Sequence, residues 1–477
     1  MFLLKAVVLS SLLFALSGAA LPQNTVAKKG KNSSPIEQRN VRAQMEFLAS
    51  DAMQGRGSGT LFEWIAGQYF GSQMRQFGIE PAGEKDAAGN PTYIQTVSIV
   101  RNSFAEAPKL TYSNGEAAVS LEHGKSMVVF RINTGNVSGP LQKISVGEKP
   151  KPGAVVYAQK KEGDDEAKFA ELVSGLFGSD AAAVLIEATE DTARNWNRFG
   201  SRNPSFSSIS GNTDNAPAFI ILDKESAEAL GAVGDGTKIE IGGKLDKPEV
   251  RKTWNAVGMI KGTDSKLMSE AIVLSAHMDH LGVRDNAPGD DKIFNGADDD
   301  ASGCVAVIEL ARVLAVGKKP KRTVYFVFFG SEEAGGYGAR YFVSTLPFPK
   351  EKLVTNLQFE MIGRPDEKVA ANELWLTGYD RSNLGPELAK QGALLVNDPH
   401  PEQNFFQRSD NYTLARQGII AHTVSSFGLH KDYHQASDEI ETIDFEHMTR
   451  SINSMVKPIE WLINSNFVPS WYEGKRP

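Results

Sequence analysis

Two kinds of hydrophobic spacing divide the chain into predicted elements. Apolar residues recur at helical spacing from about residue 35 to 48 and from 61 to 74, and a Gly- and Ser-rich loop, ASDAMQGRGSGT, lies between these two predicted helices. After about residue 253, apolar runs at 271–276, 323–329 and 354–359 alternate with helical patterns at 301–316 and 339–344. Strands without polar alternation, separated by helices, predict a sheet buried on both faces. We therefore expect a three-layer α/β/α domain with a mixed sheet.

The stretch from about residue 110 to 243 has a different pattern. Short strand-like runs occur at 127–132, 154–158, 182–187 and 218–222, with one charged helix candidate at 164–176. We expect a mainly-β accessory domain over residues 110–243, inserted into a domain that consists of residues 35–109 and 244–477. The alternative is that this stretch is simply more of one domain.

The N-terminal residues are typical of a signal peptide. Lys5 precedes an apolar run at residues 6–16 and small residues at 17–20, and a polar tether follows at 21–34. The apolar run is too short for a membrane span, so we expect an exported protein, periplasmic or secreted, with no membrane span after signal removal. The alternative is a buried N-terminal helix. Cys304 is the only cysteine, so the exported chain has no internal disulfide.

Charge and composition narrow the classes of partner. The 51 basic and 58 acidic side chains give a formal net charge of -7 and are mixed along the chain without a basic stripe, so a nucleic-acid partner has no electrostatic support. The length of 477 residues, of which 41% are hydrophobic, is enough for more than one domain.

Histidines and carboxylates follow the predicted strands. His277 and Asp279 follow the first strand, Glu332 and Glu333 the second, and Glu360 the third. Ligands of open α/β sheets bind beyond the carboxyl ends of the strands, so we expect these groups at one edge. There an imidazole can bind a metal while a nearby carboxylate orients it. Of two adjacent glutamates, one can bind metal while the other takes a proton from water.

Two choices stay open from the residue types alone. Three consecutive carboxylates at 298–300 repel one another unless they are solvated or bound to cations, so a solvated turn explains them as well as a metal site does. Asp299 is our choice to bridge two metals, although its neighbours fit by spacing. A further ligand is expected from the C-terminal region, where chemistry does not distinguish four histidines: His422, His430, His434 and His447.

Taken together, the motifs resemble those of the co-catalytic zinc aminopeptidases, whose relatives include glutamate carboxypeptidases, glutaminyl cyclases and the transferrin receptor. The resemblance covers nearly all of the chain after its leader. It rests on several motifs in family order: FLASDAMQGRGSGT, FGIEPAG, NAVGMIKGTD, AHMDHLG, GADDDASG, GSEEAGGYGAR, EMIGR, RSDNY and DYHQASDE. The stretch at 110–243 resembles the protease-associated domain that is often inserted in this family.

The resemblance implies a metal-dependent peptidase that removes N-terminal residues from peptides. It implies two zinc ions held by five side chains: His277, Asp299, Glu333, Glu360 and His434. Asp299 would bridge both ions, Asp279 would orient His277, and Glu332 would be the general base. Tyr433 is a candidate hydrogen-bond donor to the oxyanion, with aromatic packing as its alternative role.

Two positions depart from the family pattern. Glu360 stands where the family more often has Asp, and its longer side chain places the position or affinity of one zinc in doubt. Asn411 stands where His is common, so no proton role is expected there. The rival functions are a carboxypeptidase, for which Arg364 is a candidate carboxylate-binding group, a glutaminyl cyclase, and a non-catalytic binding homologue.

Overall fold

The computed structural model describes residues 35–477 apart from residue 116 and residues 212–215. The expected signal peptide (1–20) and tether (21–34) lie outside the described residues. Among the helices that the structure describes, none is long and apolar enough to cross a membrane.

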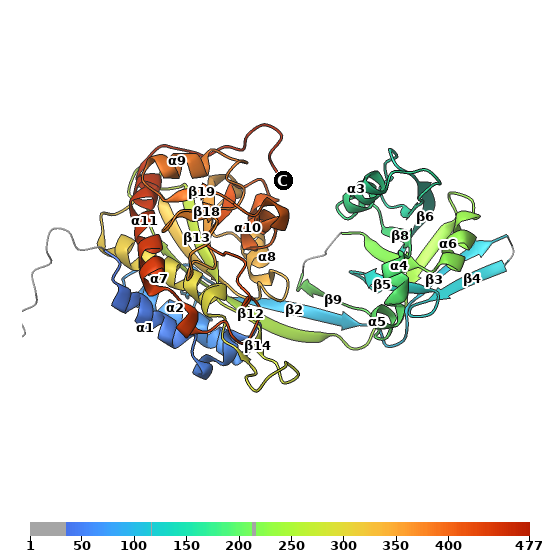
Figure 1. Ribbon diagram of the computed structural model, residues 1–477, viewed down its shortest axis with the longest axis horizontal. Coiled ribbons are helices and arrows are strands. Elements are labelled where there is room, and N and C mark those ends of the chain that lie inside the picture. The colour runs from blue at the N-terminus through green and yellow to red at the C-terminus, as the bar shows by residue number, and fades with distance from the viewer. Residues whose placement is uncertain (1–34, 116, 212–215) are drawn as a thin grey trace, which may run out of the picture. The chain divides into compact units, whose positions relative to one another are not determined.

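A mixed β-sheet, the main sheet, lies at the centre of the α/β region (Figure 1). Strands β16, β13, β17 and β20 are parallel, and β12 and β2 extend this group in antiparallel orientation. The order across the sheet is β19 (Leu395–Asn397), β18 (Leu374–Leu376), β20 (Ala421–Ser425), β17 (Leu353–Phe359), β13 (Ala271–His277), β16 (Thr323–Phe329), β12 (Glu249–Ile260), β2 (Ile94–Ser103) and β9 (Ser205–Ile209). The short β1 (Glu80–Pro81) also pairs with β12.

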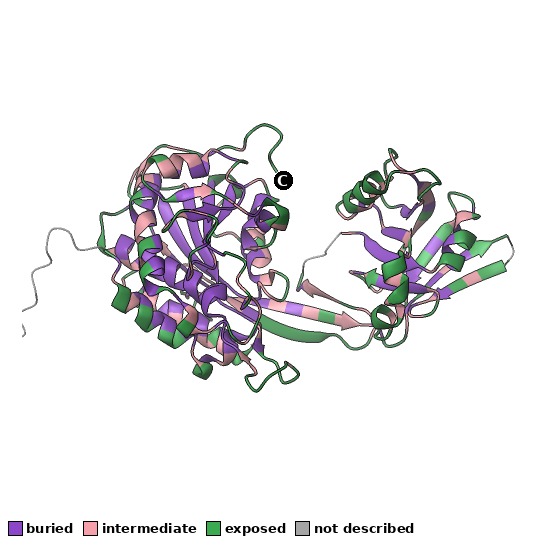
Figure 2. Ribbon diagram, in the orientation of Figure 1, coloured by how far each residue is buried: buried purple, intermediate pink, exposed green. Residues whose placement is uncertain are grey.

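Helices cover both faces of the main sheet. Alternate residues of β13 belong to two different apolar clusters, with Ile272 and Leu274 in one and Val273 in the other, because successive side chains of a strand point to opposite faces. The first cluster contains residues of α1, α2, α7 and α11, and the second contains residues of α8 and α10. Figure 2 shows the strands buried between these helices. The expected three-layer fold is therefore confirmed.

The helices around the main sheet have the following bounds: α1 (Gln38–Leu48), η1 (Asp51–Arg56), α2 (Leu61–Gln76), η2 (Ala297–Ser302), α7 (Gly303–Val316), α8 (Tyr337–Ser344), η3 (Lys350–Lys352), α9 (Leu384–Lys390), η4 (Pro401–Gln403), η5 (Phe405–Gln407), α10 (Asp410–Ala415), η6 (Ile440–Thr442) and α11 (Phe445–Asn464). A two-stranded sheet of β14 (Gly282–Val283) and β15 (Ile293–Phe294) lies beside η1.

A second sheet with its own apolar clusters is built from the middle of the chain. Its order is β4 (Ala117–Glu122), β3 (Lys109–Asn114), β11 (Lys238–Gly242), β6 (Asn136–Ile144), β7 (Val155–Ala158), β8 (Ala183–Glu187), β10 (Ala218–Leu222) and β5 (Met127–Arg131). Its helices are α3 (Glu166–Leu176), α4 (Glu190–Arg194), α5 (Trp196–Gly200) and α6 (Lys224–Gly231). Its identity as an inserted protease-associated domain stays a prediction.

Candidate metal centre

Three parallel strands of the main sheet end side by side. His277, the last residue of β13, is in register with Phe329, the last residue of β16, and Ser275 is in register with Gln358 near the end of β17. Glu332 and Glu333 follow β16 within a tight turn, and Glu360 comes directly after β17. The sheet edge therefore gathers the polar groups that the sequence places after these strands.

The three consecutive aspartates have different roles, and all are buried. Asp300 accepts hydrogen bonds from backbone N–H groups at the end of β13, at the start of α7 and just after β17. Asp298 accepts one from the backbone of Gly363. Asp438 in turn accepts hydrogen bonds from the backbone N–H groups of Asp298 and Asp299. A solvated turn is thus the wrong explanation, and Asp299 is the member whose carboxylate stays available.

The carboxylate of Asp299 faces two sets of donors. Its Oδ1 lies 3.2 Å from Nε2 of His277, and its Oδ2 lies 3.2 Å from Nε2 of His434. The same Nε2 of His434 is 3.2 Å from Oε1 of Glu333. A carboxylate that bridges two cations needs one oxygen directed toward each set of ligands, and Asp299 has this arrangement.

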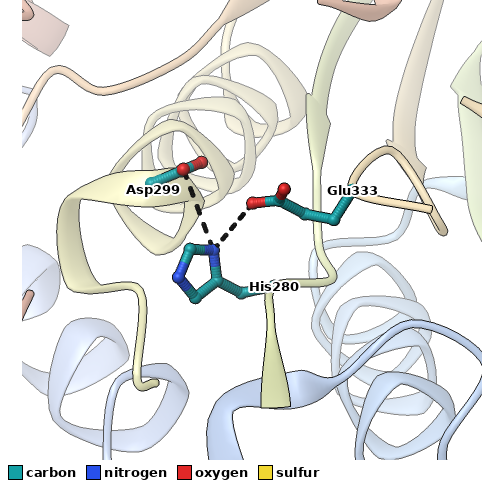
Figure 3. Close-up of side chains that lie close together, drawn as sticks. All are labelled: His280, Asp299 and Glu333. Carbon is teal, nitrogen blue, oxygen red and sulfur yellow. Dashed lines mark ion pairs between the residues drawn. The ribbon is translucent and has the colours of Figure 1, made fainter. Parts of the chain in front are cut away.

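His280, which was not predicted as a ligand from the sequence, joins the second set. Its Nδ1 lies 3.0 Å from Oε1 of Glu333 and 3.8 Å from Oδ2 of Asp299, and Figure 3 shows this one ring nitrogen facing both carboxylates. The three residues offer ligand atoms that all lie within 4.8 Å of one another. Its place in the sequence, three residues after His277 at the same strand end, is the signal that could have found it.

The other C-terminal histidines bind elsewhere. His422 lies between the Ser382 hydroxyl and the carbonyl of Thr377. His430 pairs with Asp298, and His447 lies 3.0 Å from the Ser426 hydroxyl. Of the four histidines that spacing left open, His434 is therefore the one that the structure brings to Asp299 and Glu333.

Asp279 holds the turn that carries the two glutamates. Its carboxylate accepts hydrogen bonds from the backbone N–H groups of Glu332 and Glu333 and, at 2.5 Å, from the Ser58 hydroxyl. Nδ1 of His277 is closer to the main-chain oxygen of Asp279, at 3.1 Å, than to its carboxylate, at 3.8 Å. In this structure Asp279 thus orients the His277 ring through its backbone rather than its side chain.

Glu360 interacts electrostatically with His277 and Asp299. Its Oε2 accepts hydrogen bonds from Ser409 and from Gln358, and its charge contributes to the raised pKa of Glu332. Aromatic side chains line a pocket next to it, together with Arg408: Trp375, Phe405, Phe427 and Tyr433. This pocket offers an apolar surface to a ligand beside Glu360.

Two further buried side chains, Arg56 and Glu63, fix the backbone around the site. Arg56 donates to the carbonyls of Met278, Leu48, Asn295 and Gly296. The Glu63 carboxylate accepts hydrogen bonds from the backbone N–H groups of Gly59 and Ser331 and from the hydroxyl of Thr253 in β12. Neither residue was singled out from the sequence, because a charged residue near a Gly-rich loop is typical of a solvated position.

Negative charge accumulates at this edge. Burial raises the pKa of the Glu332 carboxyl well above its usual range, and Asp410 and Glu360 add to the rise. Burial likewise raises the pKa of Asp410 to about 8. Burial alone would also raise the pKa of Asp299, but His277 and His434 hold it well below its usual range. So many buried carboxylates need compensating cations.

Three residues that the sequence singled out have other contacts here. Asn411 is buried, donates to backbone carbonyls and accepts from the Thr423 hydroxyl, so it acts as a structural amide. Arg364 pairs with Asp432 and Asp438. Tyr433 stacks on the His434 ring at a centroid distance of 3.9 Å.

The donor chemistry fits zinc. Imidazole nitrogens and carboxylate oxygens are its common ligands, and they are present in both sets around Asp299. Both ring nitrogens of His280 and Oε1 of Glu333 are buried without a hydrogen-bond partner among the described residues, as expected of atoms that await a cation.

Comparison with known proteins identifies the region that carries this site. Residues 255–457 match the model of Peptidase family M28. The chain is 26% identical over 192 residues to leupeptin-inactivating enzyme 1 of Streptomyces exfoliatus, a match covering 37% of this chain and 44% of that relative. It is 26% identical over 255 residues to aminopeptidase YwaD of Bacillus subtilis, covering 52% of each. These matches thus span about half the length of the relatives.

Among solved structures, one similar chain is BSAP, a zinc aminopeptidase from Bacillus subtilis. It is 20% identical, the match covers 91% of this chain and 97% of that chain, and the TM-score is 0.47. The family match includes the ends of β13, β16 and β17 and the segment with His434. Residues 255–457, which carry the candidate metal centre, are therefore similar to the peptidase domain of family M28.

Proposed function

We propose that the chain is an exported zinc aminopeptidase that hydrolyses N-terminal residues from peptides at the edge of the main sheet. The observation that carries the proposal is the position of the Asp299 carboxylate, because one of its oxygens contacts Nε2 of His277 and the other contacts Nε2 of His434. In a peptidase domain of family M28, this arrangement fits two zinc ions that share a carboxylate.

The site residues divide into two groups of ligands. His277 and Glu360 would hold one ion, Glu333 and His434 the other, and Asp299 both. When bound, zinc supplies Lewis-acid activation of water and of the scissile carbonyl. The longer reach of Glu360, compared with an aspartate, is accommodated by Ser409 and Gln358, which hold its outer oxygen.

Glu332 is the proposed general base. Its side chain is partly buried, and desolvation raises its pKa well above the usual range, so it can accept a proton from the attacking water and return it to the leaving amine. Asp279 fixes the turn that carries Glu332, because its carboxylate accepts hydrogen bonds from the backbone N–H groups of Glu332 and Glu333. Tyr433, beside His434, is the proposed hydrogen-bond donor to the oxyanion.

The substrate's first side chain is proposed to enter the aromatic pocket beside Glu360, so peptides with an apolar N-terminal residue are the expected substrates. Arg364 is paired with two aspartates, which argues against its binding the terminal carboxylate of a carboxypeptidase substrate. Arg408 lines the pocket and could also bind a terminal carboxylate, so aminopeptidase and carboxypeptidase activity must be distinguished by experiment.

A peptide panel tests the activity. We expect release of the first residue from peptides with a free N-terminus and no reaction with N-terminally blocked peptides. Release of C-terminal residues from blocked peptides, or conversion of N-terminal Gln to a cyclic product, would assign one of the rival activities instead. Chelation should abolish hydrolysis and zinc should restore it. Full activity after verified metal removal would refute the metal mechanism.

The role of Glu332 is tested by substitution. Glu332→Gln should keep its zinc and lose about 10²- to 10⁴-fold in kcat, the usual contribution of a general base. Glu351→Gln, at an exposed glutamate of η3, is the matched control and should keep wild-type kcat. A Glu332→Gln enzyme with wild-type turnover would remove Glu332 from the mechanism.

A further inference from the structure

His280 is a buried histidine to which the proposed mechanism gives no role. Its side chain is fully buried, and neither ring nitrogen has a hydrogen-bond partner among the described residues. Buried polar atoms in folded proteins are nearly always paired, so the unpaired Nδ1, which lies near two carboxylates, indicates a missing ligand.

The His280 ring is held in place by the backbone around it. The N–H of His280 donates to the carbonyl of Arg56 at 3.1 Å. Gly296 has a positive φ of 58° and lies against the ring, where a Cβ would be only 2.5 Å from Cγ of His280. A glycine is therefore required at position 296, and the ring direction is set by the fold rather than by a ligand.

The contact between His280 and Glu333 is a short ion pair. Nδ1 and Oε1 are 3.0 Å apart, and neither atom has a well-aligned hydrogen-bond partner among the described residues. In Figure 3 the nitrogen faces the space shared with Asp299. His280 Nδ1 and Glu333 Oε1 are therefore placed so that both could bind the same cation.

Four of the six distances among these donor atoms lie near the edge length of a tetrahedral zinc ion. Zinc lies about 2.0–2.1 Å from nitrogen and oxygen ligands, so the edges of its tetrahedron are about 3.3 Å. The edges that His280 Nδ1 makes are 3.0 Å to Glu333 Oε1 and 3.8 Å to Asp299 Oδ2. Those of His434 Nε2 to the same two oxygens are both 3.2 Å. These four distances lie on either side of the expected edge length of about 3.3 Å.

We propose that Nδ1 of His280 is a fourth protein ligand of the cation held by Asp299, Glu333 and His434. The identity of that cation as zinc rests on the proposed function. A zinc position with four protein donors resembles closed structural sites, whereas catalytic sites keep an open position. This position should therefore hold its ion more tightly than the position at His277 and Glu360.

Metal binding to His280 variants tests the proposal without using activity. Metal-free wild type, His280→Asn and His280→Gln are titrated with zinc in competition with a chromophoric chelator. Loss of a partner that only orients a ligand already weakens metal affinity by about 10–100-fold, so loss of a direct ligand should weaken the tighter site by more than about 100-fold. Cobalt substitution should show loss of the intense absorption of a four-coordinate ion.

A second measurement uses the wild type alone. X-ray absorption of the two-zinc protein should count three imidazoles over two ions if His280 is a ligand, and two over two if it is not. This result keeps the proposal testable even if both variants fail to fold, which the near-UV circular dichroism of the metal-free proteins would reveal.

His447→Gln is the matched control, because His447 is also buried but contacts the Ser426 hydroxyl, and it should leave zinc affinity unchanged. Folded His280 variants with wild-type zinc affinity and cobalt spectrum, or an imidazole count of two, would overturn the proposal. Hydrolysis that survives chelation would refute the proposed function instead, and these affinities would remain measurable.

Discussion

Replacing Arg56 by methionine removes the donors that join three segments of the candidate site. The Arg56 side chain is 1% exposed, and its nitrogens donate to four backbone carbonyls at 2.5–3.0 Å. These carbonyls belong to the end of α1, the turn after β13, and the Asn295–Gly296 loop that leads to Asp299. Methionine keeps most of the apolar stem of arginine but has no donor.

The expected loss of stability follows from those four contacts. A buried acceptor that loses its partner costs about 1–3 kcal/mol. At the lower end of that range, four acceptors together cost about 4 kcal/mol. This is a large share of the roughly 5–15 kcal/mol by which folded domains are stable. Burial also lowers the pKa of Arg56, so removal of the desolvated charge returns part of this loss.

Urea unfolding of the metal-free proteins, followed by circular dichroism, measures the difference. Arg39→Met is the control, because Arg39 is exposed and pairs only with Glu37 at the surface, and a change below about 1 kcal/mol is expected. An Arg56→Met protein within 1 kcal/mol of the wild type would refute the reasoning, since it would show that the four carbonyls find other partners at little cost.

Three further predictions concern stability and turnover. Burial lowers the pKa of His422 from 6.5 to about 4. Between these pH values His422 is protonated in the unfolded chain but not in the folded chain, so the free energy of unfolding falls as the pH drops below about 6.5. This contributes about 2 kcal/mol between pH 7 and pH 5, and unfolding curves of His422→Gln should lack that part of the slope; identical slopes would contradict it. Glu63→Met should lower stability by at least about 1–3 kcal/mol and reduce kcat more than it raises KM, because the backbone N–H of Ser331, just before Glu332, loses its acceptor; wild-type stability and kcat would disprove this. Gly330→Ala places a Cβ 2.2 Å from the Trp254 carbonyl oxygen and should destabilise by at least about 1–3 kcal/mol in urea unfolding, whereas Gly175→Ala in α3 has open space and should stabilise slightly; equal effects of the two substitutions would rule out the steric argument.

The parallel part of the main sheet could be predicted from the sequence because its strands are buried on both faces. The run at 271–276 became β13, 323–329 became β16 with the same bounds, and the predicted strand at 218–222 in the second sheet is β10. The long pair β2 and β12 was not predicted. β2 alternates between buried and partly buried residues, and β12 begins with an exposed, mostly charged stretch from Glu249 to Lys252, so neither strand is one continuous apolar run.

The candidate site was predictable where strand ends carry its groups and less so where loops do. His277, Glu332, Glu333 and Glu360 follow from the strand-end rule, but the choice among four C-terminal histidines required the fold, because the segment with His434 has no regular structure. His280 and Arg56 were passed over since their roles depend on contacts with residues far away in the chain. No spacing along the sequence encodes such contacts.

The clamp that Asp438 makes on the backbone of the Asp299 turn has a consequence for biosynthesis. Both that clamp and His434 follow every other proposed ligand in the sequence, while Ser58 and Arg56 precede them all. A ribosome-bound chain that has emerged only as far as Gly428 cannot assemble the candidate metal centre, whatever else has folded. The proposed peptidase activity therefore depends on the arrival of the segment that closes the site.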